Sequence, residues 1–379
     1  MNIKKIDVYL TRIPFLKSCR FADLPIEEMD TVFVRFEDSD GHSGWSEVFP
    51  GNKPYLTAAY SSGVFLALKE CVIPQLGTEI SIDSTENLTE QFSKIKGNRH
   101  AKAACDLAFW DIYSKKIGKP LYEVIGGQKK DIELGLVFDR YNELGPFLDD
   151  LAKAVDEGYK RVTLKTRPGW DLQILGIVRA DHPLLMIQCD LEGALSMDKH
   201  AEILYRFDDF MISLLEQPLA PSEYVGHAML QDGMRTSIAL DESITQFHQA
   251  QIALDLKSAD TFCLKPGKVG GLTEAKLIHD ACSASEVVCY AGCDYLTSIG
   301  YRSVLALSTL KNFTIPTDYI RFDEILSTDP GEQLSPVLKP DENGKERKVI
   351  ELWTEPGIGF EPDREMIEKM SIAKFSWPD

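Results

Sequence analysis

The central part of the chain alternates short apolar runs with longer segments whose apolar residues recur every three to four positions. Short apolar runs predict strands buried on both faces, and the longer spacing predicts helices that cover them. Eight runs have the strand pattern: residues 132–138, 161–165, 184–190, 211–216, 236–241, 261–265, 286–290 and 312–316. Helical spacing lies between them, for example at residues 147–157, 171–180, 199–207 and 272–282. The strand-then-helix unit recurs about every 25 residues, which is typical of a parallel barrel with outer helices.

The two ends of the chain follow other patterns. Before the barrel, strand patterns occur at residues 3–13, 31–36 and 45–48, and helical spacing occurs at 55–71 and 99–116. The Asp40-Gly41 pair is a hairpin turn signal. After the barrel, Asn343-Gly344 and Pro356-Gly357 mark further turns. The patterns predict an α+β lobe over residues 1–130, a barrel over 131–325 and a final segment, 326–379, that returns to the first lobe.

Composition places this fold in an ordinary globular class. The 379 residues are 44% hydrophobic and 26% charged, and Lys+Arg 41 against Asp+Glu 59 leaves a net charge of −18. That charge disfavours nucleic acid or an anionic membrane as a partner. Residues 1–7 carry no signal-peptide pattern and no apolar run is long enough to cross a bilayer, so we expect a cytoplasmic protein. The 8 cysteines form no CxxC pair, which predicts reduced thiols rather than disulfides or a zinc site.

Five successive predicted strands end in a charged residue, although a buried strand should be apolar throughout. These residues are Lys165, Asp190, Glu216, Asp241 and Lys265, at spacings of 25, 26, 25 and 24. Equal spacing places each charge at the same level of its own strand-helix unit. That level is the C-terminal mouth of the barrel, where barrel enzymes carry their chemistry.

The three carboxylates belong to neighbouring strands, whereas the two lysines lie four strands apart and face each other across the mouth. Three converging oxygen ligands without His or Cys suit a hard divalent ion, Mg²⁺ first and Mn²⁺ second. Without a cation, the carboxylates would raise one another's pKa values. Asp190, Glu216 and Asp241 are therefore the predicted metal ligands.

A metal ion on a substrate carboxylate stabilises the enediolate that forms when the adjacent carbon loses its proton. Lys165 and Lys265 would then transfer protons, provided that the pKa of the basic lysine is lowered. One lysine on each face permits racemisation or epimerisation, and a cycloisomerase needs the same proton chemistry. Alternatively, one lysine removes the proton and the other stabilises charge while a β-substituent leaves, which is a dehydration. The predicted partner is a small carboxylate substrate.

At these residues the chain resembles the enolase superfamily, in its muconate-lactonizing subgroup, and within it the branch of o-succinylbenzoate synthases and N-acylamino acid racemases. The resemblance covers nearly the whole chain. The segments that carry it are residues 104–111, 119–121, 126–127, 158–165, 168–171, 215–218, 240–243, 265–271 and 356–359. It implies a modified TIM (β/α)7β-type barrel with an α+β capping domain, in a homo-oligomer. It also implies Lys165 and Lys265 as the acid/base pair, magnesium on the carboxylate triad, and substrate selection by cap loops near Arg20 and residues 49–51.

The chain departs from that pattern at three places, and Glu242 is a further candidate residue. Thr163 replaces the first lysine of the subgroup's Lys-x-Lys motif, and Arg167, on the same strand face, is the candidate replacement for its charge. Glu192 adds a carboxylate beside the metal ligand Asp190. Asp294 lies in the segment 293–298, where relatives carry another pattern. Glu242, directly after the third ligand, either supports the metal site or caps a helix.

Two other functions remain open at the level of sequence. A lysine inside a barrel can also form a Schiff base without any metal, so Lys165 or Lys265 could be a covalent nucleophile. Alternatively, the protein is a degenerate homologue that keeps the metal site and has lost proton transfer, as Thr163 and Leu296 suggest. None of the 7 histidines ends a predicted strand, which argues against a histidine base.

Overall fold

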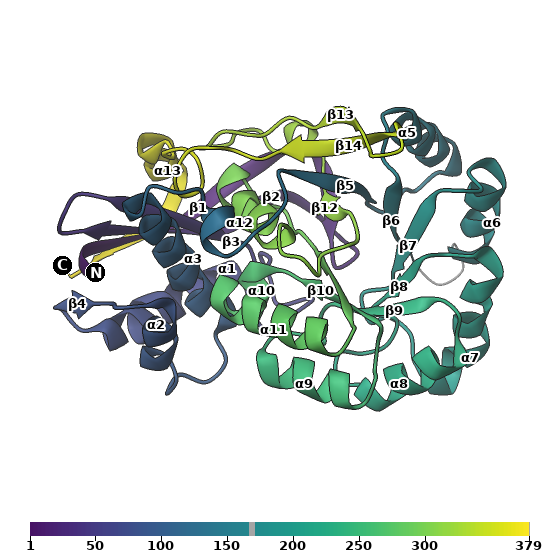
Figure 1. The fold of residues 1–379 in the computed structure, drawn as a ribbon, viewed down its shortest axis with the longest axis horizontal. Helices are drawn as coiled ribbons and strands as arrows, with labels where there is room; N and C mark the ends of the chain where they lie inside the picture. Colours follow the sequence, from purple (N-terminus) through teal and green to yellow (C-terminus); the bar gives the residue numbers. More distant parts are fainter. Residues whose placement is uncertain (167–170, 379) are drawn as a thin grey trace.

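A computed structural model of the chain describes residues 1–166 and 171–378 and shows an α+β lobe beside a parallel barrel (Figure 1). The lobe, which we call the cap, holds an antiparallel sheet in the order β15-β1-β2-β3. Its elements are β1 (Asn2–Phe21), β2 (Leu24–Asp38), β3 (Ser43–Val48), α1 (Ser61–Ala67), β4 (Ile80–Ser81), α2 (Thr85–Gln91), α3 (Arg99–Lys116) and α4 (Leu121–Val124). The α3 bounds are those that the spacing predicts. Helix α1 starts six residues later than the predicted segment 55–71.

The barrel alternates parallel strands with outer helices. The strands are β5 (Asp131–Phe138), β6 (Arg161–Lys165), β7 (Met186–Asp190), β8 (Leu214–Glu216), β9 (Ser237–Leu240), β10 (Thr261–Leu264), β11 (Val288–Ala291) and β12 (Thr317–Tyr319). The helices are α5 (Leu144–Asp156), α6 (Asp171–Asp181), α7 (Met197–Arg206), α8 (Tyr224–Gly233), α9 (Phe247–Asp255), α10 (Pro266–Val269), α11 (Leu272–Ala284) and α12 (Ser298–Ser308). Strand β12 pairs with β5 and closes the cylinder, which confirms the predicted (β/α)7β-type barrel with an α+β cap. In the described part of the chain, no helix is long and apolar enough to span a membrane.

The eighth strand was predicted at 312–316, and that position is wrong. The strand is Thr317–Tyr319, and the apolar run before it is a loop whose Phe313 forms a single bridge to Cys289. The apolar pattern misses this strand because the strand contains a buried aspartate. Asp318 accepts a hydrogen bond there from Arg161. A buried charge is tolerated when it is paired, and the partner lies far away in the sequence.

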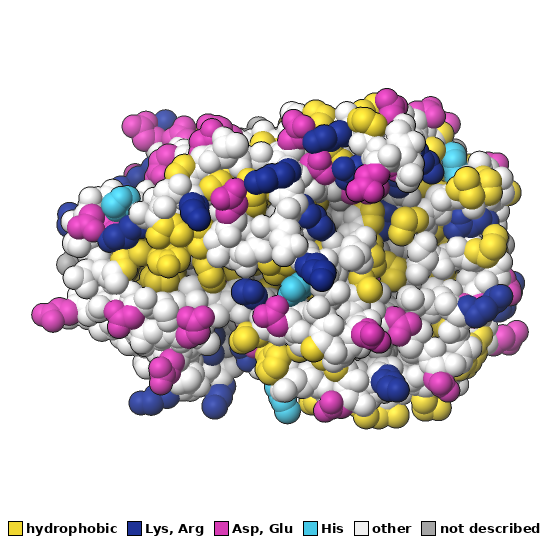
Figure 2. Space-filling view, viewed as in Figure 1, with side chains coloured by type: hydrophobic (Ala, Val, Ile, Leu, Met, Phe, Trp, Pro, Cys, Tyr) yellow, Lys and Arg dark blue, Asp and Glu magenta, His cyan; other side chains and the backbone are white. Residues whose placement is uncertain are grey.

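The last segment contacts both parts of the molecule. Hairpin strands β13 (Val337–Pro340) and β14 (Glu346–Glu351) extend the barrel sheet, because β14 pairs antiparallel with β5. After α13 (Arg364–Met370), β15 (Ser371–Trp377) pairs with β1, so the two ends of the chain lie side by side (Figure 1). We expected the whole segment to pack on the cap, whereas its hairpin packs on the barrel. Acidic and basic side chains are interspersed over the face shown in Figure 2.

A buried carboxylate joins the cap to the barrel. Glu47 of β3 accepts hydrogen bonds from the backbone N–H of Thr297 (2.9 Å) and of Gly300 (3.0 Å) and from the Thr297 hydroxyl (2.6 Å). These donors lie at the N-terminus of α12, where a negative charge is favourable. Burial nevertheless raises the pKa of Glu47 to about 7. The cap is therefore tied to the barrel by a group that titrates near neutral pH.

Candidate active site

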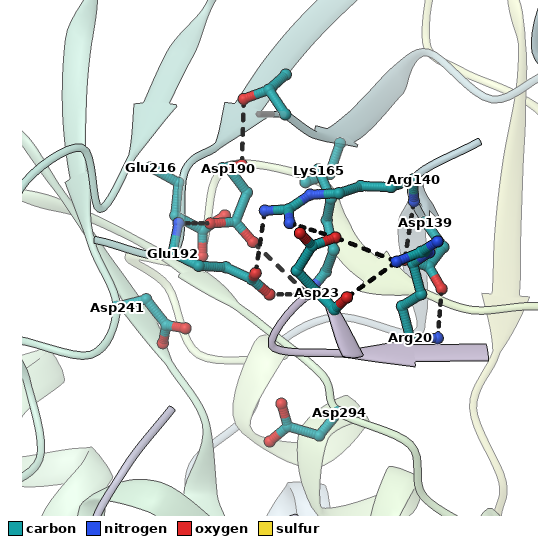
Figure 3. Close-up of polar contacts among 12 residues, drawn as sticks. Arg20, Asp23, Asp139, Arg140, Lys165, Asp190, Glu192, Glu216, Asp241 and Asp294 are labelled. Atoms are coloured by element: carbon teal, nitrogen blue, oxygen red, sulfur yellow. Dashed lines mark hydrogen bonds and ion pairs between the residues drawn. The ribbon is translucent and has the colours of Figure 1, made fainter. Parts of the chain in front are cut away.

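The barrel mouth opens into a cavity of about 450 Å³ beneath the β1–β2 hairpin of the cap. The described site candidates all line it: Arg20, Thr163, Lys165, Asp190, Glu192, Glu216, Asp241, Glu242, Lys265 and Asp294. Arg167 lies outside the described residues. Figure 3 shows most of these carboxylates gathered with Lys165 at the mouth. The strand-end charges therefore meet in one cavity, as their spacing predicts.

Strand register explains this convergence. Lys165 pairs with Asp190 across β6 and β7, and Asp190 pairs with Glu216 across β7 and β8. Asp241 and Lys265 directly follow the last residues of β9 and β10. Parallel strands present equivalent residues at one level of a barrel, so the five side chains share a rim.

The carboxylate triad is crowded in a way that suits a cation. Burial and the neighbouring carboxylates raise the pKa of Asp190 to about 6 and the pKa of Glu216 well above its usual value. One oxygen of Glu216 is held by the Gln188 amide, which donates to Oε2 at 2.5 Å. Ligand atoms of Glu216, Asp241 and Cys263 lie within 4.8 Å of one another. Burial raises the pKa of the Cys263 thiol well above its usual value, so oxygens remain the suitable ligands.

Each candidate lysine has its own carboxylate partner besides a triad member. Lys165 Nζ lies 2.6 Å from Glu192 and 3.9 Å from Asp190. Lys265 Nζ lies 2.9 Å from Asp241 and 3.1 Å from Asp294. Gly292 leaves room for Lys265, because a Cβ there would overlap its side chain.

These partners reverse the pKa direction that a basic lysine needs. Burial alone would lower both lysine pKa values, but attraction to Glu192 and Asp190 raises the pKa of Lys165 well above its usual value. Asp241 and Asp294 do the same for Lys265. A divalent cation would neutralise Asp190 and Asp241, and it would therefore lower the pKa of both lysines.

A buried arginine lies beside Thr163. Its hydroxyl accepts a hydrogen bond from Arg161 Nη1 at 2.9 Å, and Arg161 is completely buried two residues earlier on the same strand face. Arg161 also donates to Gln188 and Asp318. Gly135 of β5 makes room for this guanidinium, because a Cβ there would collide with it. A buried cation beside Thr163 therefore comes from Arg161.

Glu242 does not cap a helix, since α9 begins at Phe247 after Gln246. Its Oε2 is buried and has no hydrogen-bond partner among the described residues. Burial, followed by repulsion from Asp241 and Asp190, raises its pKa to about 8. The structure thus places Glu242 beside the predicted metal ligands as a further carboxyl group.

Sequence reasoning missed two cations at the site. Lys268 contacts Asp241 directly, and its position three residues after Lys265 on a short helix was the available signal. Together Lys265 and Lys268 lower the pKa of Asp241, although burial alone would raise it. Arg140 pairs with Glu192 at 3.2 Å. It lies in the loop after β5, and no spacing rule singled it out.

A closed (β/α)7β barrel with converging carboxylates between two opposed lysines defines a class of barrel enzymes with acid/base chemistry at the mouth. Two family models match this chain: "Mandelate racemase / muconate lactonizing enzyme, N-terminal domain" over residues 6–126 and "Enolase C-terminal domain-like" over residues 147–366. The chain belongs to the mandelate racemase/muconate lactonizing enzyme family of the enolase superfamily, and it is an enzyme.

Curated relatives support this assignment. The chain is 34% identical to an o-succinylbenzoate synthase of Geobacillus kaustophilus, over 89% of this chain and 88% of that protein. It is 31% identical to an N-succinylamino acid racemase of Amycolatopsis, over 99% of both chains. A crystal structure of an enolase superfamily member from Listeria innocua superimposes with a TM-score of 0.89, at 26% identity over 99% of this chain and 98% of that one. The predicted family is thereby confirmed.

Proposed function

We propose that the protein is a magnesium-dependent enzyme that moves the α-proton of a small carboxylate substrate, with racemisation or epimerisation as the net reaction. The observation that carries this proposal is the pair of lysines on opposite sides of the carboxylate triad. Lys165 ends β6 and Lys265 follows β10, four strands away in the barrel order. A planar substrate anion bound between them would meet one amine on each face.

Asp190, Glu216 and Asp241 would hold the metal ion. The fit rests on their crowding, because burial and mutual repulsion raise the pKa of both Asp190 and Glu216. Glu242 adds a fourth carboxyl group whose Oε2 lacks a described partner. When bound, Mg²⁺, with Mn²⁺ as the second choice, supplies positive charge against the negative charge that develops on the substrate carboxylate.

The lysines carry out the proton transfers. One neutral amine takes the proton from the substrate α-carbon and becomes an ammonium, leaving the electron pair delocalised into the carboxylate. The opposite ammonium donates a proton to the other face of the same carbon, which inverts it. Glu192 and Asp294 remain beside Lys165 and Lys265 as counter-charges for the ammonium forms.

The test is deuterium uptake from D₂O at the substrate α-carbon, followed by NMR in the presence of Mg²⁺. The substrates are both enantiomers of N-succinyl and other N-acylamino acids, dipeptides and hydroxy acids. We expect uptake with interconversion of enantiomers for at least one class. No uptake across the whole library would contradict the proposal and favour a degenerate metal-binding homologue.

Dehydration is the second candidate, because several relatives are o-succinylbenzoate synthases, the first two at 34% and 33% identity. In that reaction one lysine removes the α-proton and returns it to the hydroxide that leaves the β-carbon, so that water departs, while the other lysine stabilises the negative charge between the two steps. Appearance of an alkene or aromatic ultraviolet absorption, without enantiomer interconversion, would favour it. Homo-oligomerisation, a cytoplasmic location and the domain boundaries at residues 130 and 325 stay predictions.

A further inference from the structure

The tip of the β1–β2 hairpin is docked onto the barrel mouth. The Ala22-Asp23 turn has positive φ at both residues, 51° and 61°, which is the two-residue turn that matches strand twist. The backbone N–H of Arg20 donates to Asp139 at 2.7 Å, and the Tyr295 hydroxyl donates to the Arg20 carbonyl at 3.0 Å. The hairpin tip therefore has a defined position over the cavity.

Arg140 links this tip to the catalytic groups. Its guanidinium lies 2.7 Å from Asp23 of the cap and 3.2 Å from Glu192 of the barrel, and its side chain is only 7% exposed (Figure 3). The Arg140 backbone N–H donates to Asp139 at 2.8 Å, and this contact fixes where the side chain begins. A rigid guanidinium that bridges two carboxylates sets the position of both.

Glu192 continues the connection to Lys165. It occupies a left-handed backbone conformation, with φ at 47°, and its side chain is 7% exposed between Arg140 and Lys165. Such a conformation in a non-glycine residue is costly and is commonly retained at functional sites. The flexible Lys165 side chain has its shortest ion pair with Glu192, at 2.6 Å, while Asp190 lies at 3.9 Å.

Lys265 is held differently. Its ion-pair partners, Asp241 and Asp294, follow barrel strands, and within the described residues no cap side chain pairs with either carboxylate. Lys165 is thus connected to the cap through a chain of ion pairs, whereas in the described part of the chain the ion pairs of Lys265 go to barrel residues.

We propose that Arg140 is a positioning residue through which the cap hairpin sets the place of Lys165, by way of Asp23, Arg140, Glu192 and Lys165. This inference rests on the proposed function for its kinetic consequence. Loss of the connection will slow proton transfer on the face of the substrate that Lys165 serves and leave the Lys265 face intact. Arg140 itself takes no part in the covalent step.

The kinetic test compares deuterium uptake by the two substrate enantiomers, which Lys165→Ala and Lys265→Ala first assign to their faces. Arg140→Met is expected to slow uptake on the Lys165 face by about tenfold or more, because small misplacements of a reacting group are costly. Uptake on the Lys265 face should change by less than about twofold, and Asp294→Asn should show the opposite asymmetry. Arg140→Lys, which keeps the charge, should be intermediate. Arg99→Met removes another cap-to-barrel ion pair, the one with Glu274, and it serves as the matched control because both residues lie outside the cavity.

A second measurement needs no substrate or metal. Hydrogen–deuterium exchange of the hairpin peptide 18–27 should increase in Arg140→Met and also in Lys165→Met, because coupling through the chain is reciprocal. Lys265→Met and Asp294→Asn should leave that peptide unchanged. Equal slowing of both faces by Arg140→Met would overturn the inference, as would hairpin exchange that ignores Lys165→Met. If the wild type takes up no deuterium into any substrate, the proposed function fails. Amide exchange of the hairpin peptide then still tests whether Arg140 connects the hairpin to Lys165.

Discussion

The two sides of the barrel mouth use the same residue types but contact the cap in different ways. On the Lys165 side, cap residue Asp23 reaches the lysine through Arg140 and Glu192. On the Lys265 side, buried cap carboxylates bind the barrel scaffold: Glu47 accepts from backbone N–H groups at the start of α12, and Asp106 accepts from Thr273 of α11. The first contact ends on a candidate catalytic group, whereas the second ends on the scaffold. By our proposal, the contact through Arg140 positions Lys165 for proton transfer, whereas the contact through Glu47 holds the cap on the barrel.

A second difference lies beneath the lysines, where each side has a buried cation. Lys268 contacts the predicted metal ligand Asp241 directly. Hydrogen bonds join Arg161 to Glu216 through Gln188, whose carbonyl oxygen must face the guanidinium because an arginine can only donate. The Gln188 amide is thereby left to donate to Glu216. The Lys165 side therefore depends on a longer network of buried polar groups, and such networks are costly when broken.

The largest expected effect treats both sides alike. Removal of divalent ions with EDTA should abolish α-proton exchange for both substrate enantiomers. The reason is that a single metal ion on Asp190, Glu216 and Asp241 would serve proton transfer by either lysine. Mg²⁺ should restore exchange on both faces, as followed by NMR. Exchange that survives chelation would instead favour the Schiff-base alternative, which borohydride trapping of a lysine adduct would then identify.

The next largest effect is expected from removing one lysine at a time, which distinguishes the two sides of the barrel mouth. Lys165→Ala and Lys265→Ala should each lose deuterium uptake for one enantiomer, by about 10²- to 10⁴-fold, since a positioned acid or base contributes that much. Uptake by the opposite enantiomer should persist without inversion. Thermal unfolding midpoints near that of the wild type would show that both variants fold. Loss of both faces in either variant would contradict the assignment of one lysine to each face.

A stability measurement tests the network under Lys165. Arg161→Met should lower the free energy of unfolding by about 3–5 kcal/mol, because Asp318 is left buried without its partner. Urea denaturation at neutral pH measures this change. Arg161→Met combined with Asp318→Leu should recover part of the loss, and a double variant as unstable as the single one would show that the Arg161–Asp318 pair is not the cause.

The cap contact on the Lys265 side should appear as a pH dependence of stability. The Glu47 pKa is about 7 in the folded protein and about 4.5 when unfolded. Protonation of Glu47 therefore stabilises the folded state fully below pH 4.5, and this contribution to the free energy of unfolding is lost as the pH rises through 7. The free energy of unfolding should therefore fall less in Glu47→Gln than in the wild type between pH 5 and pH 8. The two decreases should differ by up to about 3 kcal/mol. Urea denaturation at both pH values measures the difference. Parallel profiles would mean that Glu47 does not titrate in this range.

The local sequence predicted some elements closely. Helix α3 begins and ends where its spacing indicates, although it is buried between the cap sheet and the barrel, where Asp106 accepts hydrogen bonds from Thr273 of α11. Strand β12 was misplaced because Asp318 looks polar in sequence and is buried only with Arg161 as its partner. The hairpin of the last segment was assigned to the cap, although its edge pairs with β5. Pairing between distant strands is a tertiary choice that local spacing does not encode.

For the site, the sequence by itself determined the family, the barrel and the five charges at the mouth. It did so because strand and helix periods are local, and equal spacing places equivalent residues at one level of a parallel barrel. Only the tertiary structure decided that Glu192 pairs with Lys165, that Arg161 lies beside Thr163, and that Arg140 joins the cap to the barrel. The physical reason is that an ion pair depends on the distance between two side-chain ends, which loops distant in sequence set only after the chain has folded.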